Sequence, residues 1–232
     1  MKFYYTNLDS CHESTGLVVV IDVIRAFTNA AYAFSRGARE IFPVSTVEEA
    51  MQLRANHPNA LACGEVGGIP PEGFDFGNSP TQTSTLDLEG CIVIQRTSAG
   101  TQGIVRSVKA DILLAASLVV AGATVAYIGN LVPETVTFVV TGQREGDSGD
   151  EDLACAEYLE ALLRGYYPDP APYIDRVYKS RDALFHLDPD FPAFPKSDLD
   201  HCTKINAFDF AMPVTKEDSH FVIRAVQARV KA

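Results

Sequence analysis

The chain has 232 residues, 47% of them hydrophobic and 21% charged, so it can bury one sizeable core, and wholesale disorder is excluded. Lysine and arginine total 19 against 30 aspartates and glutamates, and this net charge of −11, without a basic cluster, excludes a general nucleic-acid binder. No apolar run reaches the roughly 20 residues that span a bilayer, and the first residues do not resemble a secretory signal. We therefore expect a cytoplasmic protein that does not contact a membrane.

Short apolar runs alternate with helical patterns over the first two thirds of the chain, which predicts an α/β fold. The β-branched run at 17–21 predicts a strand that is covered on both faces. The other predicted strands are 40–44, 61–63, 91–95, 111–114 and 135–141. Helices are predicted over 26–36, from 45, after 96–101, from 117, and over 150–164.

The strands and helices predicted from residue 91 onward repeat the order of those predicted before it, although few residues are identical. The order suggests two similar halves, about 1–90 and 91–165, that arose by duplication of a strand-loop-helix-strand-helix unit. Residues 166–232 are less periodic and rich in proline, so we expect a cap or edge segment there. We expect the whole chain, 1–232, to form a single compact unit.

Polar residues follow several predicted strands where the chain enters a helix. Ligands in open α/β sheets bind at the carboxyl ends of strands, where helix N-terminal amides favour anions. Asp22 directly follows an apolar strand, so its carboxylate needs a partner. Either Asp22 pairs with Arg25, or it binds a divalent cation while Arg25 faces a substrate. The small and hydroxyl residues of 97–101 suit an anion cradle, and they equally suit helix capping.

The long loop 64–80 is dense in glycine and proline, and such loops inside compact domains are often functional. Its oxygen-bearing side chains suit Mg²⁺, which keeps several waters and completes its octahedron with phosphate oxygens. Together with Asp22, this loop forms a candidate metal site. The acidic run 150–152 at a helix start is explained as well by compensation of the helix dipole.

Other common catalytic signatures are missing from the sequence. No histidine falls in the loops described above, which counts against zinc or a histidine relay. The motifs of serine hydrolases, dinucleotide-binding proteins and P-loop proteins are absent.

Four segments carry a specific pattern: VIDVIRA at 20–26, GE at 64–65, GFDFGNSP at 73–80 and EDLACA at 151–156. In this order they resemble the 2-phosphosulfolactate phosphatases of coenzyme M biosynthesis, over most of residues 17–165. The resemblance implies a three-layer α/β/α fold with a mixed sheet. It also implies a Mg²⁺-dependent phosphatase that hydrolyses 2-phospho-3-sulfolactate to 3-sulfolactate and phosphate.

By position, the resemblance implies Asp22, Glu65 and Asp75 as catalytic residues and metal ligands, with Glu151 and Asp152 as further metal ligands. Arg25 is implied as a catalytic residue that also contacts the substrate. The other residues implied to bind the phosphate, carboxylate or sulfonate are Thr28, Asn78, Ser79, Arg96, Thr97, Ser98, Gly100 and Thr101.

The sequence departs from the family where members often read Gly-Glu-Arg, because Val66 follows Glu65 here. Arg96 is a candidate to replace the lost cation from another direction. The expected partner is a small anionic phosphorylated substrate, and a homodimer is left open. The alternatives are a phosphatase for another small phosphorylated hydroxy acid and a non-catalytic anion-binding module. Attack by a carboxylate-oriented water is preferred over an aspartyl-phosphate on Asp22, which stays open.

Overall fold

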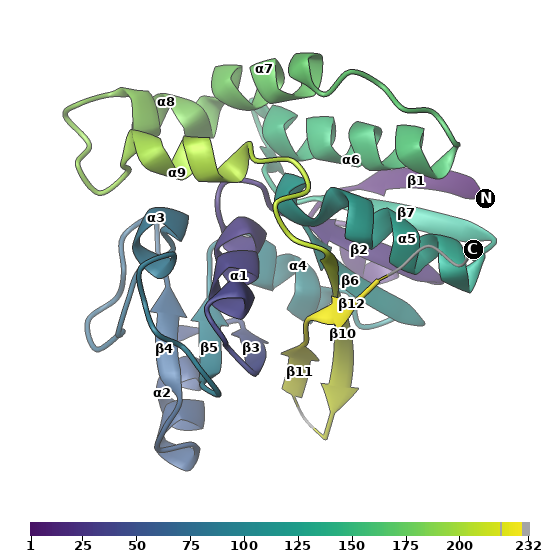
Figure 1. Cartoon of the computed structure of the whole chain (residues 1–232). Coiled ribbons are helices and arrows are strands. Elements are labelled where there is room, and N and C mark those ends of the chain that lie inside the picture. Colours follow the sequence, from purple (N-terminus) through teal and green to yellow (C-terminus); the bar gives the residue numbers. More distant parts are fainter. Residues whose placement is uncertain (219, 229–232) are drawn as a thin grey trace.

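The computed structural model describes residues 1–218 and 220–228, and it confirms the α/β fold with a large mixed sheet flanked by helices (Figure 1). Along the sheet the strands are β1 (Lys2–Thr6), β7 (Thr135–Val140), β2 (Leu17–Ile21), β6 (Ile112–Ala116), β10 (Phe210–Glu217), β11 (His220–Ile223), β3 (Glu40–Val44), β5 (Ile92–Arg96) and β4 (Leu61–Gly64). The short strand β12 (Val226–Gln227) pairs with β10.

The sheet consists of two parallel blocks joined by an antiparallel hairpin. Strands β1, β7, β2 and β6 form one block, and β3, β5 and β4 form the other. The hairpin β10–β11 lies between them and is antiparallel to β6 on one side and to β3 on the other. Figure 1 shows β1 and β4, at opposite ends of the sheet, running in clearly different directions, so the sheet is strongly twisted.

Strand β2 explains the layers. Its apolar residues alternate between the two faces of the sheet, as the period of a strand requires. Val18 and Val20 pack on one face in a core with α1 (Ala26–Ser35), whereas Val19 and Ile21 pack on the other face with α5 (Ala121–Leu131) and α6 (Asp150–Leu163). Helix α4 (Gly100–Arg106) joins the first core, and α2 (Val47–Asn56) packs on β3 and β5.

The strand order has a property that a duplicated unit would give. Without β1 and the hairpin β10–β11, the strands follow the order β7-β2-β6-β3-β5-β4 along the sheet. If β2, β3 and β4 trade names with β5, β6 and β7, respectively, the result is the same order read backwards. The duplication itself stays a prediction.

The structure divides the segment 166–232, which the sequence assigned to a cap or edge. Strands β10 and β11 lie inside the sheet, so this part is not an edge. Helix α7 (Ala171–Lys179) packs on α6, while α8 (Arg181–Leu187) and α9 (Lys196–Cys202) lie over the short helix α3 (Pro80–Thr83), beside the ends of the central strands (Figure 1). Within the described residues, no helix is both long and apolar enough to cross a membrane.

Candidate active site

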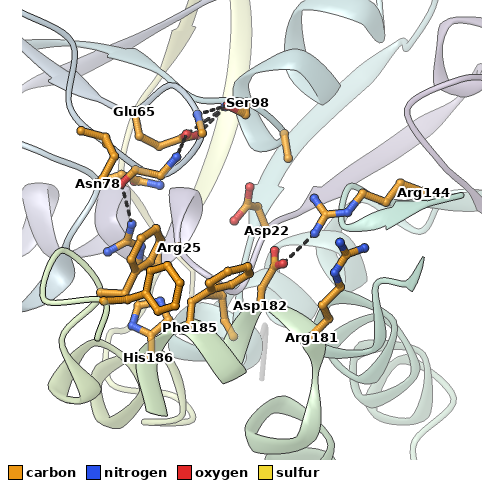
Figure 2. A pocket seen from close by; sticks show the side chains of 17 residues that line it. Asp22, Arg25, Glu65, Asn78, Ser98, Arg144, Arg181, Asp182, Phe185 and His186 are labelled. Carbon is orange, nitrogen blue, oxygen red and sulfur yellow. Dashed lines mark hydrogen bonds and ion pairs between the residues drawn. The ribbon is translucent and has the colours of Figure 1, made fainter. Parts of the chain in front are cut away.

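A cavity of about 530 Å³ opens between the strand ends and the C-terminal helices (Figure 2). This volume is typical of a small-molecule site. One wall comes from the loops after β2, β4 and β5 and contains Arg25, Glu65, Asn78 and Ser98, whereas Asp22, also after β2, lies between this wall and the next. The opposite wall comes from the chain after β7, and its lining residues are Arg144, Arg181, Asp182, Phe185, His186, Phe191 and Phe194.

Asp22 directly follows β2 and lies between the two walls in Figure 2, with only 5% of the residue exposed. Its Oδ1 atom accepts a 2.8 Å hydrogen bond from the amide of Ala26. Gly100, the first residue of α4, approaches so closely that a Cβ there would lie 2.7 Å from Asp22 Oδ2. Burial, with the nearby carboxylates of Glu65 and Asp182, raises the pKa of Asp22 to about 7.

Glu65 follows β4 and is locked in place by the next strand end. Its Oε1 atom accepts a hydrogen bond from the amide of Ser98, and its Oε2 atom accepts from the Ser98 hydroxyl at 2.9 Å and from the Gly68 amide at 2.7 Å. These donors hold the carboxylate in one orientation inside the cavity. The ends of β4 and β5 are therefore joined through one side chain.

Arg25 lines the cavity, but it does not pair with Asp22. Its Nη1 atom contacts Asp198 Oδ2 of α9 at 2.7 Å, and both residues are buried. The guanidinium also lies 5.0 Å from the centre of the Phe194 ring. Asp198 accepts a further hydrogen bond from the Ser79 hydroxyl at 2.7 Å. Sequence reasoning missed Asp198, which fixes both Arg25 and Ser79 from a distant segment.

The second wall carries two arginines that the sequence analysis did not select. Arg144, on the hairpin β8 (Gln143–Arg144) and β9 (Asp147–Ser148), donates to Asp182 Oδ1 at 2.7 Å and lies 3.2 Å from Asp147 Oδ2. Arg181 begins α8, and its Nη1 atom lies 3.8 Å from the same Asp147 oxygen. Both side chains are about half exposed.

Glu151 and Asp152 form a buried acidic group with Asp22, without lining the cavity themselves. Asp152 joins two strand ends, because Oδ1 accepts from the Val23 amide at 2.7 Å and Oδ2 from the Gly142 amide at 2.8 Å. Burial raises the pKa of Glu151 to about 7, and burial with the charges of Glu151 and Asp22 raises that of Asp152 well above its ordinary value.

Several residues selected from the sequence lie outside the cavity lining and have structural partners. Asp75 accepts from Arg54 at 2.9 Å and from the Ala62 amide at 2.8 Å, so the structure does not bring it beside Asp22. Arg96 donates to the Glu65 carbonyl at 2.7 Å. The hydroxyls of Thr28, Thr97 and Thr101 bond within their own loops, and Ser79 caps α3.

The donor set of the first wall fits a magnesium ion. Asn78 lines the cavity with 6% exposure, and its Oδ1 atom accepts no hydrogen bond from the described part of the chain. That oxygen, with the carboxylates of Asp22 and Glu65, is the hard donor type that Mg²⁺ prefers. Among residues 1–218 and 220–228, no group of three or more Asp, Glu, Cys or His side chains is arranged to hold a metal ion. Mg²⁺ tolerates this, because waters and phosphate oxygens usually complete its shell.

His186 illustrates what the sequence did not reveal. It lines the cavity from α8 and is buried, with Nδ1 3.0 Å from the Pro195 carbonyl. Burial is the main cause that lowers its pKa. At the second wall the sequence offers the polar loop 142–149 after the predicted strand 135–141 and a proline-rich segment that carries no chemistry by itself.

The fold and the cavity together define an α/β protein with a cavity at its strand ends that carboxylates and arginines line. Comparison with known families agrees: the family described as "2-phosphosulpholactate phosphatase" matches residues 5–189. A relative from Bacillus subtilis named "Probable 2-phosphosulfolactate phosphatase" is 34% identical over 86% of this chain and 87% of its own length. A relative of the same name from Carboxydothermus hydrogenoformans is 30% identical over 96% of this chain and 95% of its own.

The chain belongs to the 2-phosphosulfolactate phosphatase family, whose members are phosphoric monoester hydrolases. The resemblance noted in the sequence is thereby confirmed at the level of the family and of the reaction class.

Proposed function

We propose that this protein hydrolyses 2-phospho-3-sulfolactate to 3-sulfolactate and phosphate in the cavity around Asp22, with Mg²⁺ bound there. The observation that carries the proposal is the position of Asp22, a buried carboxylate between a carboxylate-lined wall and a wall with two arginines. Family membership supports the reaction, and the names of the relatives support the substrate.

Asp22, Glu65 and the Asn78 side-chain oxygen would hold the metal. When bound, Mg²⁺ supplies positive charge that offsets the buried carboxylates and the phosphoryl oxygens. Asp75, implied as a ligand by the resemblance, is engaged by Arg54 and Ala62, so we leave it out of this set. Glu151 and Asp152 instead set the charge behind Asp22, and Asp152 also holds the ends of β2 and β7 together.

The protein contributes mainly by fixing groups before the substrate arrives. Phosphoryl transfer depends on positioning and on stabilising charge at the phosphoryl oxygens. The Asp198 carboxylate and the Phe194 ring hold Arg25 in one orientation at the cavity, so little reorganisation is needed when the phosphoryl group binds. Ser98 and Gly68 do the same for Glu65.

We favour direct attack by a water that a carboxylate of the cavity orients. A bond forms between the water oxygen and phosphorus, the bond from phosphorus to the C2 oxygen breaks, and that oxygen takes up the proton that the water loses. The alternative is an aspartyl-phosphate on Asp22. A single turnover of substrate with a radiolabelled phosphoryl group, quenched in acid, separates the two: label bound to Asp22 in the quenched protein supports the aspartyl-phosphate, and release of label without any bound to the protein supports direct attack.

A phosphate-release screen tests the proposed function. The purified chain is assayed on phosphosulfolactate, phospholactate and phosphoglycolate, with Mg²⁺ and after chelation. We expect the highest kcat/KM for phosphosulfolactate, loss of turnover on chelation and recovery with Mg²⁺. Turnover that survives complete chelation would reject the metal role, and preference for another phospho-acid would reject the substrate. The cytoplasmic location and the part in coenzyme M biosynthesis stay predictions.

A further inference from the structure

The proposed substrate carries a phosphate, a carboxylate and a sulfonate, and the site described so far leaves the sulfonate without a partner. Arg96 was the expected replacement for the family's missing cation. Its Nη1 atom donates to the Glu65 carbonyl at 2.7 Å and to the Ser98 hydroxyl at 3.3 Å, and it does not line the cavity. The cation for a distal anion must therefore come from elsewhere.

The cavity is lined by three arginines, and their carboxylate partners distinguish them. Arg25 is matched by buried Asp198 at 2.7 Å, and Arg144 is matched by Asp182 at 2.7 Å. Arg181 differs: within the described residues its one ion pair is the 3.8 Å contact to Asp147, longer than a hydrogen bond. Its guanidinium donors remain available to a ligand.

We propose that Arg181, assisted by Arg144, binds the sulfonate of the substrate and thereby determines specificity; this inference rests on the proposed function. Figure 2 shows the two guanidinium groups close together on the wall that faces Asp22. Both side chains are about half exposed, at 56% and 50%, so a ligand can reach them. A guanidinium offers several N–H donors in a fixed plane and is weakly hydrated, which suits an oxyanion with three oxygens.

The shape of the substrate favours the sulfonate over the carboxylate at this position. The carboxylate is attached directly to the carbon that bears the phosphate, whereas the sulfonate is one methylene further out. With the phosphate beside Asp22, the sulfonate is the anion that extends furthest across the cavity toward Arg181. Its full ionisation at all ordinary pH values makes a permanent arginine charge a suitable partner.

The test separates the three anionic groups by chemistry. The wild type, Arg181→Ala and Arg181→Lys are assayed on phosphosulfolactate, on phospholactate, which lacks the sulfonate, and on 2-phosphooxyethanesulfonate, which lacks the carboxylate. Arg164→Ala is the matched control, because Arg164 is also about half exposed at 49% but lies outside the cavity lining. Arg181 is chosen over Arg144 because its removal leaves the Arg144–Asp182 pair intact.

We expect Arg181→Ala to lower kcat/KM on both sulfonated substrates on the order of 10- to 100-fold, mainly through KM, and to leave phospholactate within about twofold. Arg181→Lys should recover part of the loss, and Arg164→Ala should change nothing. Equal losses on all three substrates would indicate a structural role for Arg181. Losses confined to phosphosulfolactate and phospholactate, the two substrates with a carboxylate, would assign the arginine to the carboxylate. No loss on any substrate would exclude contact with the substrate. Each of these three results overturns the inference.

A binding measurement keeps this inference separate from the proposed function. If the wild type hydrolyses none of the three compounds, the proposed function fails. Calorimetric binding of 3-sulfolactate against lactate, to the wild type and to Arg181→Ala, then still decides the sulfonate site. We expect the alanine variant to lose its preference for 3-sulfolactate. Equal preference in the two proteins would overturn the inference whatever the turnover.

Discussion

Two buried carboxyl groups, Asp22 in the cavity and Glu151 behind it, have pKa values raised to about 7, chiefly because burial penalises their charged forms. In the unfolded chain such groups titrate near pH 4. Between these values the folded protein, without metal, therefore holds protons that the unfolded chain has lost. The contribution of these two carboxyl groups to the free energy of unfolding is fully present below about pH 4 and is lost as the pH rises through 7.

Glu151→Gln tests this linkage. Glutamine cannot ionise, so the variant avoids the cost of burying a charge at high pH. In chelated protein we expect the unfolding free energy of the variant, relative to wild type, to rise by roughly 2–3 kcal/mol from pH 5 to pH 8. Urea titrations at the two pH values measure it, with exposed Glu48→Gln as the control. A relative stability that stays constant or falls with pH would contradict the raised pKa.

At the residue scale, the sequence predicted which residues lie at the cavity better than it predicted which side chains they bond to. Asp22 could be found because it directly follows an apolar strand, and its place at the cavity follows from that alone. The partner of Arg25 could not be found, since Asp198 lies 173 residues away on a helix with no distinguishing pattern. Asp75 belongs to the specific motif 73–80, yet its side chain bonds to Arg54 and Ala62.

At the scale of elements, α9 holds the loop after β2 in place. The Arg25–Asp198 pair connects them, and Asp198 also accepts from the Ser79 hydroxyl and the Thr81 amide at the start of α3. One buried carboxylate thus joins three segments of the chain. The pair lies at the cavity wall, so α9 is part of the site's support although it was expected only as a cap or edge.

Asp198→Asn tests this connection. Asparagine keeps an acceptor oxygen but leaves the buried Arg25 charge without its counter-charge, which typically costs about 3–5 kcal/mol. We expect a loss of unfolding free energy of this order in urea denaturation, and a higher KM in the same protein. Asp200→Asn, on the exposed side of the same helix, should stay within about 0.5 kcal/mol of wild type. Equal stability of the two variants would show that the pair does not hold the loop.

The part of the second wall that follows the loop after β7 could not be predicted from the sequence, for a related physical reason. Strand ends can be located from apolar runs, and the loops after β2, β4 and β5 were found in this way. Helices α8 and α9 are short, their packing is decided by tertiary contacts, and no periodic pattern marks which side faces a ligand. Arg181 on α8 could be identified only once the chain had folded back over the strand ends.

At the scale of the whole molecule, the C-terminal hairpin joins the two parallel blocks into one sheet. Strand β10 pairs with β6, and β11 pairs with β3 through Ile223 and Ile41. Sequence patterns predicted the strands of both blocks except β1, and they did not predict this insertion, because the partners of β10 are distant in sequence. The loops of both blocks form the first wall, so the hairpin is required for the site as well as for the fold.

Met212→Ala in β10 tests this role of the hairpin. Met212 is fully buried in the core shared by α1 and the sheet, and truncation of such a side chain costs about 2–5 kcal/mol. We expect a loss of this size in chemical denaturation, in a single transition, because both blocks depend on the same core. Val226→Ala, at a residue 39% exposed, should stay near wild type. Two separate transitions would contradict a single cooperative sheet.

The central claim, that Asp22 is the catalytic carboxylate of a phosphatase cavity, is tested most directly by phosphate release from 2-phospho-3-sulfolactate with wild type and Asp22→Asn. The account predicts Mg²⁺-dependent turnover by the wild type. For the variant it predicts a fall in kcat on the order of 10³-fold or more, with an unchanged circular dichroism spectrum and cooperative unfolding. A folded Asp22→Asn protein that releases phosphate at close to the wild-type rate would contradict it.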